Sequence, residues 1–338
     1  MSDQRVHPFE LLTPQALLDA LDCAGLRGDG RLLQLNSYEN RVFQVYLEDG
    51  TAVVAKFYRP GRWSDEQILE EHHFALELAA AEVPVIAPLC LAGGSTLAHA
   101  SIGDQRFRFA AYPSRSGHGP ELDKPEILLW LGRFIGRLHA VGARRPFAAR
   151  RTLNPATYGA AARDRVLSLG TVAEPAQSAW HAACNAALAA VGSAFDSLSP
   201  AALRLHGDCH PGNILWRDEG PHVVDLDDAC LGPAMQDLWM LLSGSRTAMA
   251  TQLATVLSGY RQFKDFDNHE LGLIEPLRTL RMIHHSAWLA ERWSDPAFPV
   301  AFPWFGTPGY WAGQASELRE QVEAMAEPAL EIVGLDRI

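Results

Sequence analysis

The sequence predicts an α+β protein of two lobes, a small N-terminal sheet with few helices and a larger, mainly helical C-terminal part. Three observations favour this division. Alternating apolar patterns and a tight-turn signal come first in the chain, whereas apolar residues at helical spacing dominate beyond residues 113–120. With 338 residues, the chain is also long enough to form two packed cores.

Signals for strands and two helices occupy the first part of the chain. Thr13 before Pro14 is typical of a helix start, and Ser64 with Gln67 has the spacing of a capping box that opens a helix reaching about Ala81. Glu-Asp-Gly at 48–50 is a turn signal between two strands, which predicts antiparallel pairing. Alternation of apolar and polar residues predicts strands at 31–35 and 42–47, and further strands are expected at 51–57, 89–92 and 107–112.

The second part of the chain follows a turn-rich segment at 113–120. Apolar residues recur at helical spacing over 127–138, and the stretch 174–195 is rich in alanine. A short strand-loop-strand at 203–225 interrupts the helices, which resume from Gln236. We therefore predict a nucleotide-binding lobe at residues 1–112 and a catalytic and substrate lobe at 113–338.

Composition excludes several classes of function. The chain has 29 lysines and arginines against 40 acidic residues, a net charge of −11, which argues against nucleic acid or an anionic membrane as a partner. No apolar run is long enough to span a membrane, and residues 1–8 lack the pattern of a signal peptide. The 5 cysteines form no C-x-x-C pair, so a reduced, cytoplasmic protein is expected.

The densest polar cluster of the chain consists of two segments, 205–216 and 223–228, and apolar residues flank the polar ones in each segment. It contains Asp208, Asn213 and Asp225. Carboxylates and an amide brought together on a loop make oxygen ligands for Mg²⁺, and Asp208 can orient an incoming hydroxyl and accept its proton. Phosphoryl transfer needs charge neutralisation, in-line positioning and a weak base, so the cluster indicates that reaction.

A lysine with apolar neighbours stands in the first lobe. Lys56 lies near the end of the strand predicted at 51–57, where burial requires an anion or a carboxylate as its partner. The following helix offers Glu71 or Glu70. Because consecutive helix residues diverge by about 100°, only one of the two can face the lysine.

These motifs resemble a known family. His206-x-Asp208, Asn213 and a later Asp225 match the pattern of the aminoglycoside-phosphotransferase and protein-kinase superfamily. More narrowly, LNSYENRV at 35–42, KFYRP at 56–60 and LHGDCHPGNILW at 205–216 are similar to the bacterial stress response kinase A family of serine/threonine protein kinases. GPAMQDLWMLL at 232–242 and WSDPAFP at 293–299 extend the likeness over nearly the whole chain. The resemblance implies a bilobal protein-kinase-like fold.

It also implies a role for each matching residue. Asp208 and Asp225 would be catalytic, Asp208 as the group that takes the acceptor's proton, while Asn213 and Asp225 would hold Mg²⁺. The side chains expected to contact the co-substrate ATP or to position its phosphates are those of Ser37, Lys56 and Glu71. Asp237 would support the catalytic loop, and residues 110–113 would meet the adenine. The glycine-rich G-x-G-x-x-G loop of protein kinases is absent, and residues 36–40 stand in its place.

Several residues have a second interpretation. His206 and His210 alternate as zinc ligands can, although no further Cys/His cluster completes such a site, and His206 is better explained as a buried brace of the loop. Asp227 and Asp228 are either further metal ligands or, as we favour, capping or solvated groups. Ser37 either contacts ATP or bonds its own backbone in a turn.

The function expected from the sequence is transfer of the γ-phosphate of MgATP to serine or threonine hydroxyls of a protein, with the chain itself as one candidate acceptor. The protein acceptor and the stress-response setting come from the resemblance alone. A small-molecule kinase acting on homoserine, choline or an aminoglycoside is the alternative. A non-catalytic nucleotide-binding module is disfavoured because Lys56, Asp208, Asn213 and Asp225 are all present. We expect a monomer.

Overall fold

The structure, a computed structural model, describes residues 9–174 and 176–332. Residues 1–8, where the sequence predicts no signal peptide, lie outside the described part. The described chain divides into 2 compact units. Unit 1 holds residues 9–118 together with the later segments 215–217 and 222–227, and unit 2 holds the remainder. The first unit thus continues past the predicted boundary at residue 112 and includes two short segments from the second half of the sequence.

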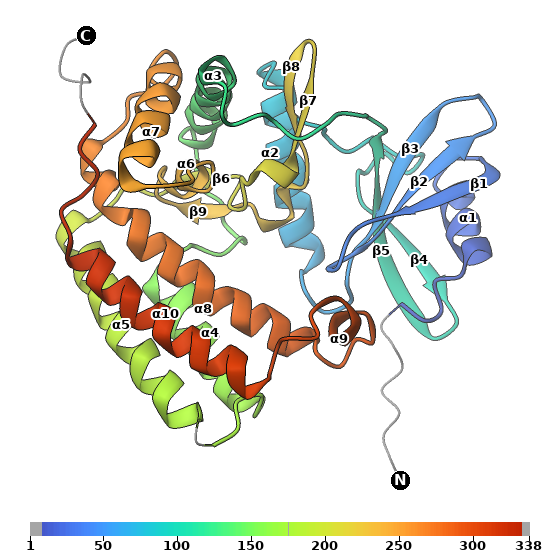
Figure 1. Cartoon of the computed structure of the whole chain (residues 1–338). Coiled ribbons are helices and arrows are strands. Elements are labelled where there is room, and N and C mark those ends of the chain that lie inside the picture. Colours follow the sequence, from blue (N-terminus) through green and yellow to red (C-terminus); the bar gives the residue numbers. More distant parts are fainter. Residues whose placement is uncertain (1–8, 175, 333–338) are drawn as a thin grey trace. The chain divides into compact units, whose positions relative to one another are not determined.

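Unit 1 is built on a 5-stranded sheet with strand order β1-β2-β3-β5-β4. Every neighbouring pair is antiparallel, so the predicted small antiparallel sheet is confirmed (Figure 1). Helix α1 follows the cap of Thr13, and α2 opens with the capping box of Ser64 and Gln67. The bounds are α1 Pro14–Cys23, β1 Gly28–Leu35, β2 Arg41–Leu47, β3 Ala52–Phe57, α2 Asp65–Ala80, β4 Ala98–Ile102 and β5 Gln105–Pro113.

One predicted strand of unit 1 is wrong. Residues 89–92 do not form a strand of the sheet, although Leu89 N donates to Ala111 O of β5 at 2.7 Å. Leu91 N donates instead to the nearby Ser95 O at 2.9 Å. The sheet instead gains β4, which pairs with β5 from Ala98 to Ile102. A short apolar run such as Leu89–Ala92 is compatible with an extended backbone, but ladder pairing also needs a neighbouring strand in register.

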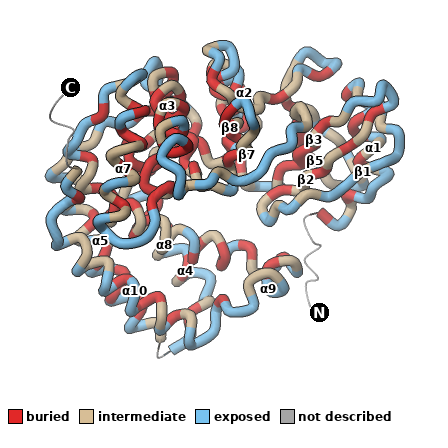
Figure 2. The backbone as a smooth tube through the Cα atoms, turned by 45° about the horizontal axis from the view of Figure 1, so that its top comes forward, coloured by how far each residue is buried: buried red, intermediate tan, exposed pale blue. Residues whose placement is uncertain are grey.

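The sheet separates two apolar clusters of unit 1. On one face, Phe43, Val45, Val53 and Phe57 pack with Leu17 and Leu21 of α1. On the other, Tyr58 and Ala110 pack with Trp63 and Ile68 beside and within α2. Successive strand residues point to opposite faces, so Lys56, between Ala55 and Phe57 of the α1 face, points to the α2 face. Figure 2 shows that many residues of these strands are themselves buried.

Two backbone bonds attach the segment 222–227 to unit 1. Val223 N donates to Pro84 O at 2.9 Å and Ile86 N donates to Val223 O at 3.1 Å, next to a parallel bridge between Val85 and Val223. The segment begins with the last two residues of β8 Gly220–Val223, which forms a hairpin with β7 Ile214–Arg217. These bonds fix the entry to Asp225.

Unit 2 is mainly helical, as the sequence predicts. Helices α5, α8 and α10 enclose a core around Trp180, Ile283 and Trp311, and strands β6 and β9 pair antiparallel (Figure 1). The bounds are α3 Pro125–Gly142, π-helical η1 Pro155–Ala160, α4 Ala161–Ser168, α5 Ala176–Leu198, β6 Leu203–Leu205, 3-10 η2 Pro211–Asn213, 3-10 η3 Leu226–Asp228 (Leu226 and Asp227 belong to unit 1), β9 Cys230–Gly232, α6 Gln236–Trp239, α7 Arg246–Tyr260, 3-10 η4 Asn268–Leu273, α8 Ile274–Arg292, α9 Ala297–Ala301 and α10 Pro308–Ala326.

Helices α3 and α7 cross at close range through glycines. A Cβ on Gly132 would lie 1.9 Å from Val256 O, and one on Gly259 would lie 2.1 Å from Leu129 O. Only hydrogen fits at these positions, so the backbones touch where larger residues would separate them. Within the described residues, no helix is both long and apolar enough to span a membrane.

Candidate active site

Lys56 sits on the central strand of the unit 1 sheet. Its backbone is paired on both sides, with Val42 of β2 and with Ala110 of β5. The residue is buried. A position with ladder bonds on both sides and little solvent has a fixed backbone and a side chain that needs a charged partner.

Two aspartates supply that partner. Lys56 Nζ lies 2.8 Å from Asp225 Oδ1 and 3.1 Å from Asp227 Oδ1. Burial by itself would lower the pKa of Lys56. The negative charges of Asp225 and Asp227, and to a smaller extent that of Glu71, outweigh the effect of burial and raise the pKa of Lys56 well above its usual value. The lysine is therefore held as an ammonium.

Of the two glutamates that the sequence offered, Glu71 is the buried one. It is 2% exposed on α2, whereas Glu70 is half-buried. Glu71 acts on Lys56 through its charge, and the hydrogen bond of the ammonium goes to Asp225 instead. Residues 110–113, expected at the adenine, are the last four of β5 and pair with residues 53–56 of β3.

Asp227 differs from its expected capping or solvated role. Its side chain is 4% exposed and forms ion pairs with Lys56 and with Arg62. Asn40 Nδ2 donates to its Oδ2 at 3.3 Å. The sequence gave no sign of this, because Arg62 and Asn40 approach Asp227 only through the fold of unit 1.

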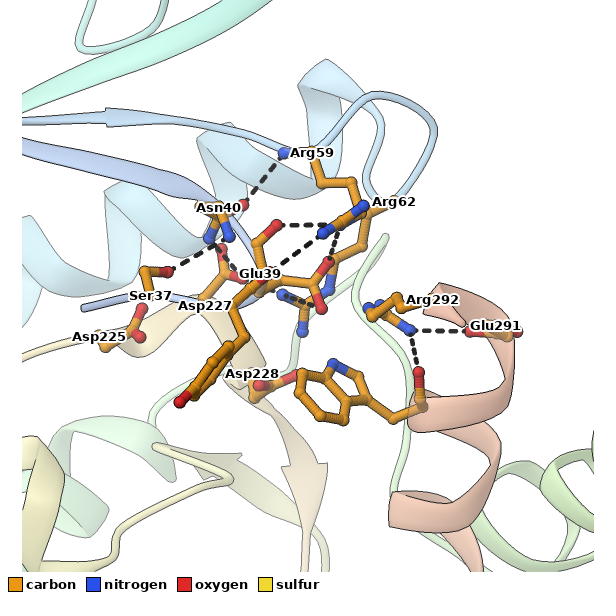
Figure 3. Close-up of polar contacts among 12 residues, drawn as sticks. Ser37, Glu39, Asn40, Arg59, Arg62, Asp225, Asp227, Asp228, Glu291 and Arg292 are labelled. Atoms are coloured by element: carbon orange, nitrogen blue, oxygen red, sulfur yellow. Dashed lines mark hydrogen bonds and ion pairs between the residues drawn. The ribbon is translucent and has the colours of Figure 1, made fainter. Parts of the chain in front are cut away.

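The loop between β1 and β2 is tied down by the same network (Figure 3). Arg59 N donates to Asn40 Oδ1 at 3.0 Å, and Arg59 Nε donates to the Glu39 carbonyl at 2.9 Å and pairs with its carboxylate at 3.1 Å. Asn40 N donates to Ser37 Oγ at 3.3 Å, the local turn bond that was the second interpretation of Ser37. Side chains thus hold a loop that lacks the usual glycines.

Asp225 has a left-handed backbone, with φ of 62°. Aspartate tolerates this region better than most residues, yet it remains sparsely populated and is typical of functional sites. Its side chain is 51% exposed although it accepts the hydrogen bond of Lys56. A carboxylate that is fixed by one cation and still open to solvent can take a second cation.

In unit 2, a fully buried aspartate holds the loop that carries Asp208. Asp237 Oδ2 accepts from His206 N at 2.8 Å and its Oδ1 accepts from Gly207 N at 2.9 Å. His139 Nε2 lies 3.0 Å from the same carboxylate. Burial raises the pKa of Asp237, but the bonds and charges of His139 and His206 outweigh it, so that the pKa lies below its usual value. The carboxylate is therefore ionised.

Gly207 is required by the same loop. Its φ is 85°, and a Cβ would lie 2.2 Å from the carbonyl oxygen of Asp228. Asn213 Nδ2 donates to the Asp208 carbonyl at 2.9 Å, which leaves the amide oxygen, the atom suited to a metal, outside that bond. The loop backbone is therefore held by close contact at Gly207 and by the hydrogen bond from Asn213.

The carboxylate of Asp208 is bound by side chains of unit 2. Arg281 of α8 forms a short ion pair with its Oδ1, and His210 Nε2 lies 3.5 Å from its Oδ2. Arg281 was not predicted from the sequence, where nothing distinguishes it from the other arginines of the chain.

The described residues contain no group of three or more His, Cys, Asp or Glu that could hold a metal ion. His206 is fully buried, and its Nδ1 accepts from Asp208 N at 3.3 Å, as expected for a brace of the loop. The zinc interpretation of His206 and His210 therefore has no support. Asn213 and Asp225 offer hard oxygen donors, which fit Mg²⁺ and not a thiolate-binding metal.

The fold and these residues define a kinase-like phosphotransferase, and the comparisons agree. The model of the "Phosphotransferase enzyme family" matches residues 31–273. Stress response kinase A of Salmonella choleraesuis (strain SC-B67) is 46% identical over 97% of this chain and 98% of its own length. Serine/threonine protein kinase RdoA of Salmonella typhimurium (strain LT2) is 45% identical over the same shares. The chain belongs to the phosphotransferase enzyme family and, within it, to the stress response kinase A family.

A solved structure supports the fold. Amicoumacin kinase hAmiN, in complex with AMP-PNP, Ca²⁺ and Ami, matches with a TM-score of 0.71 over 92% of this chain and 93% of its own. The two sequences are 18% identical, so the likeness concerns the fold alone.

Proposed function

We propose that this protein is an ATP-dependent serine/threonine protein kinase that transfers the γ-phosphate of MgATP to protein hydroxyls in a bacterial stress response. The observation that carries the phosphotransfer part is the ion pair of Lys56 with Asp225, which joins a buried cation to a half-exposed carboxylate. The protein acceptor is supported by a relative 45% identical to this chain that is named a serine/threonine protein kinase.

In this proposal, residues of unit 1 bind the nucleotide. The Lys56 ammonium contacts the α- and β-phosphates, and the charge of buried Glu71 helps to keep that lysine protonated. Ser37 contacts the nucleotide from the loop that Arg59 and Asn40 hold in place. An ordered loop loses little conformational entropy when ATP binds, which favours binding.

Asn213 and Asp225 would hold Mg²⁺ through their side-chain oxygens. When bound, the metal neutralises charge on the phosphates. Asp225 keeps its orientation because Lys56 binds one of its oxygens and its backbone is fixed in the left-handed region.

Asp208 would act on the acceptor. One carboxylate oxygen accepts the proton of the serine or threonine hydroxyl while a bond forms from that hydroxyl oxygen to the γ-phosphorus. The bond from the γ-phosphorus to the bridging oxygen of ADP breaks, and ADP leaves. The loop held by Asp237 keeps Asp208 in place for this step.

The experiment is incubation of the purified protein with γ-labelled ATP and Mg²⁺, alone, with generic protein acceptors, and with a panel of amino alcohols and aminoglycosides. Phosphoserine or phosphothreonine is expected, on the chain itself or on an added protein. Label found only on a small molecule would instead identify a metabolite kinase. Asp208→Ala should bind MgATP in a thermal-shift assay and lose label transfer by about 10²-fold or more.

A cytoplasmic location is part of the proposal. All five cysteines are free thiols in the structure, and three of them, Cys184, Cys209 and Cys230, are buried. Unpaired cysteines agree with a reducing compartment.

A further inference from the structure

The loop that carries Asp208 is held at its backbone by one set of residues, and the carboxylate of Asp208 is held by another set. The backbone is fixed by Asp237, which accepts from His206 N and Gly207 N, and by Gln236 Nε2, which donates to the Gly207 carbonyl at 2.9 Å. None of these bonds reaches the Asp208 side chain. Among the described residues, the carboxylate contacts Arg281 and, at the longer distance of 3.5 Å, His210.

The position of Arg281 is set by a well-packed helix. Its neighbours Leu277, Leu280 and Ile283 on α8 are buried at 0–1% exposure, whereas the Arg281 side chain is 42% exposed. Helix α8 therefore cannot shift easily, while the guanidinium stays within reach of solvent. Its one ion-pair partner in the described part of the chain is Asp208.

We propose that Arg281 is a positioning residue for the phosphotransfer step. The guanidinium binds Oδ1 of Asp208 and so fixes the rotation of the carboxylate, which leaves Oδ2 to accept the proton of the acceptor hydroxyl. Without this contact, the carboxylate can rotate while the loop backbone stays in place. Because a misplaced base costs turnover and not nucleotide affinity, the effect falls on kcat. The inference rests on the proposed role of Asp208.

The first test compares Arg281→Ala with the wild type in steady-state transfer from ATP to a protein acceptor. We expect kcat to fall by about 10-fold or more, with the KM for ATP unchanged within about twofold. Arg165→Ala is the matched control, because Arg165 forms a half-exposed ion pair with Glu291 of the same helix at 2.9 Å. That variant should keep wild-type kcat. Equal kcat values for R281A and wild type would overturn the proposal.

A second test separates positioning from a structural role. In an Asp208→Asn background, R281A should lower kcat by less than about twofold more, since the group that it positions is no longer a base. A full additive loss, or a kcat loss that follows a lower melting temperature, overturns the proposal. Arg281→Lys, which keeps the charge and most of the stem, should have a kcat between those of the wild type and R281A.

The two proposals fail in different ways. If D208N keeps wild-type kcat, the proposed base is wrong, and with it the role of Arg281. If D208N is inactive while R281A is fully active, only the role of Arg281 is wrong.

Discussion

The ammonium of Lys56 lies 2.8 Å from Oδ1 of Asp225, although the two residues are 169 positions apart. The pair exists because residues 222–227 return to unit 1 and attach there through Val223. Lys56 is nearly inaccessible and Asp225 is half-exposed, so the pair has one buried and one open end. In the proposed function, the buried end contacts phosphate and the open end holds the metal.

Lys56→Met should lower kcat/KM for ATP by about 10²-fold or more, because a preorganised cation at the phosphates is lost. The measurement is label transfer over a range of MgATP concentrations. Lys124→Met is the control, since Lys124 pairs with Glu121 on the surface at 2.6 Å. A K56M variant with the kcat/KM of the wild type would exclude the lysine from nucleotide binding.

Asp227→Asn should destabilise the protein by about 3 kcal/mol, because two buried cations, Lys56 and Arg62, lose a charged partner. Urea unfolding followed by circular dichroism measures this difference. The neighbouring Asp228→Asn is the control, since Asp228 is one-third exposed and lies 3.8 Å from Arg151. Its cost should stay below about 1 kcal/mol. Equal losses for the two variants would contradict a buried network at Asp227.

Local signals were sufficient to predict much of the fold. Thr13 and Ser64 each cap the first turn of the helix that directly follows them in sequence. The hydrogen bonds that determine these helix starts therefore involve residues within four positions of one another. The sequence also predicts phosphotransfer chemistry at Asp208, Asn213 and Asp225, because the three lie within 18 positions and their residue types fit one reaction. The distances between these three residues could not be predicted from the sequence.

The remaining features could not be predicted from the sequence, because they depend on contacts between residues that are far apart in the chain. Arg62 and Asp227 are 165 positions apart, and Arg281 and Asp208 are 73 apart. Each pair depends on how strands and helices pack, and no local pattern marks one arginine over another. The inclusion of segments 215–217 and 222–227 in unit 1 has the same origin, since Trp216 bonds to the backbone of His118, and Val223 bonds to that of Pro84 and Ile86.

Asp237→Asn should destabilise the protein by about 3 kcal/mol and lower turnover, because one amide oxygen cannot replace a carboxylate that accepts from His206 N, Gly207 N and His139. The pKa of Asp237 lies below its usual 3.8 in the folded protein. Its contribution is therefore present above about pH 4 and is lost as the pH falls through the lower folded value.

Unfolding of D237N and wild type at pH 7 and near pH 3 checks this, since the difference between them should shrink in acid. The control is Asp164→Asn, where the aspartate is 63% exposed beside Arg163. A difference that is unchanged near pH 3 would count against an ionised Asp237.

Glu270→Gln should stabilise the protein at neutral pH. Glu270 is 5% exposed, and burial raises its pKa to about 7, even though Met235 N donates to its Oε2 at 2.8 Å. A carboxyl whose folded pKa exceeds its unfolded value of 4.5 favours folding at low pH, and this contribution is lost as the pH rises from about 4.5 to about 7. The shift corresponds to about 3 kcal/mol. Glutamine accepts the same bond without a charge, so E270Q should gain up to that amount at pH 8 and little at pH 4.5. Urea unfolding across this range measures the difference, and one that does not vary with pH would show that Glu270 does not titrate there.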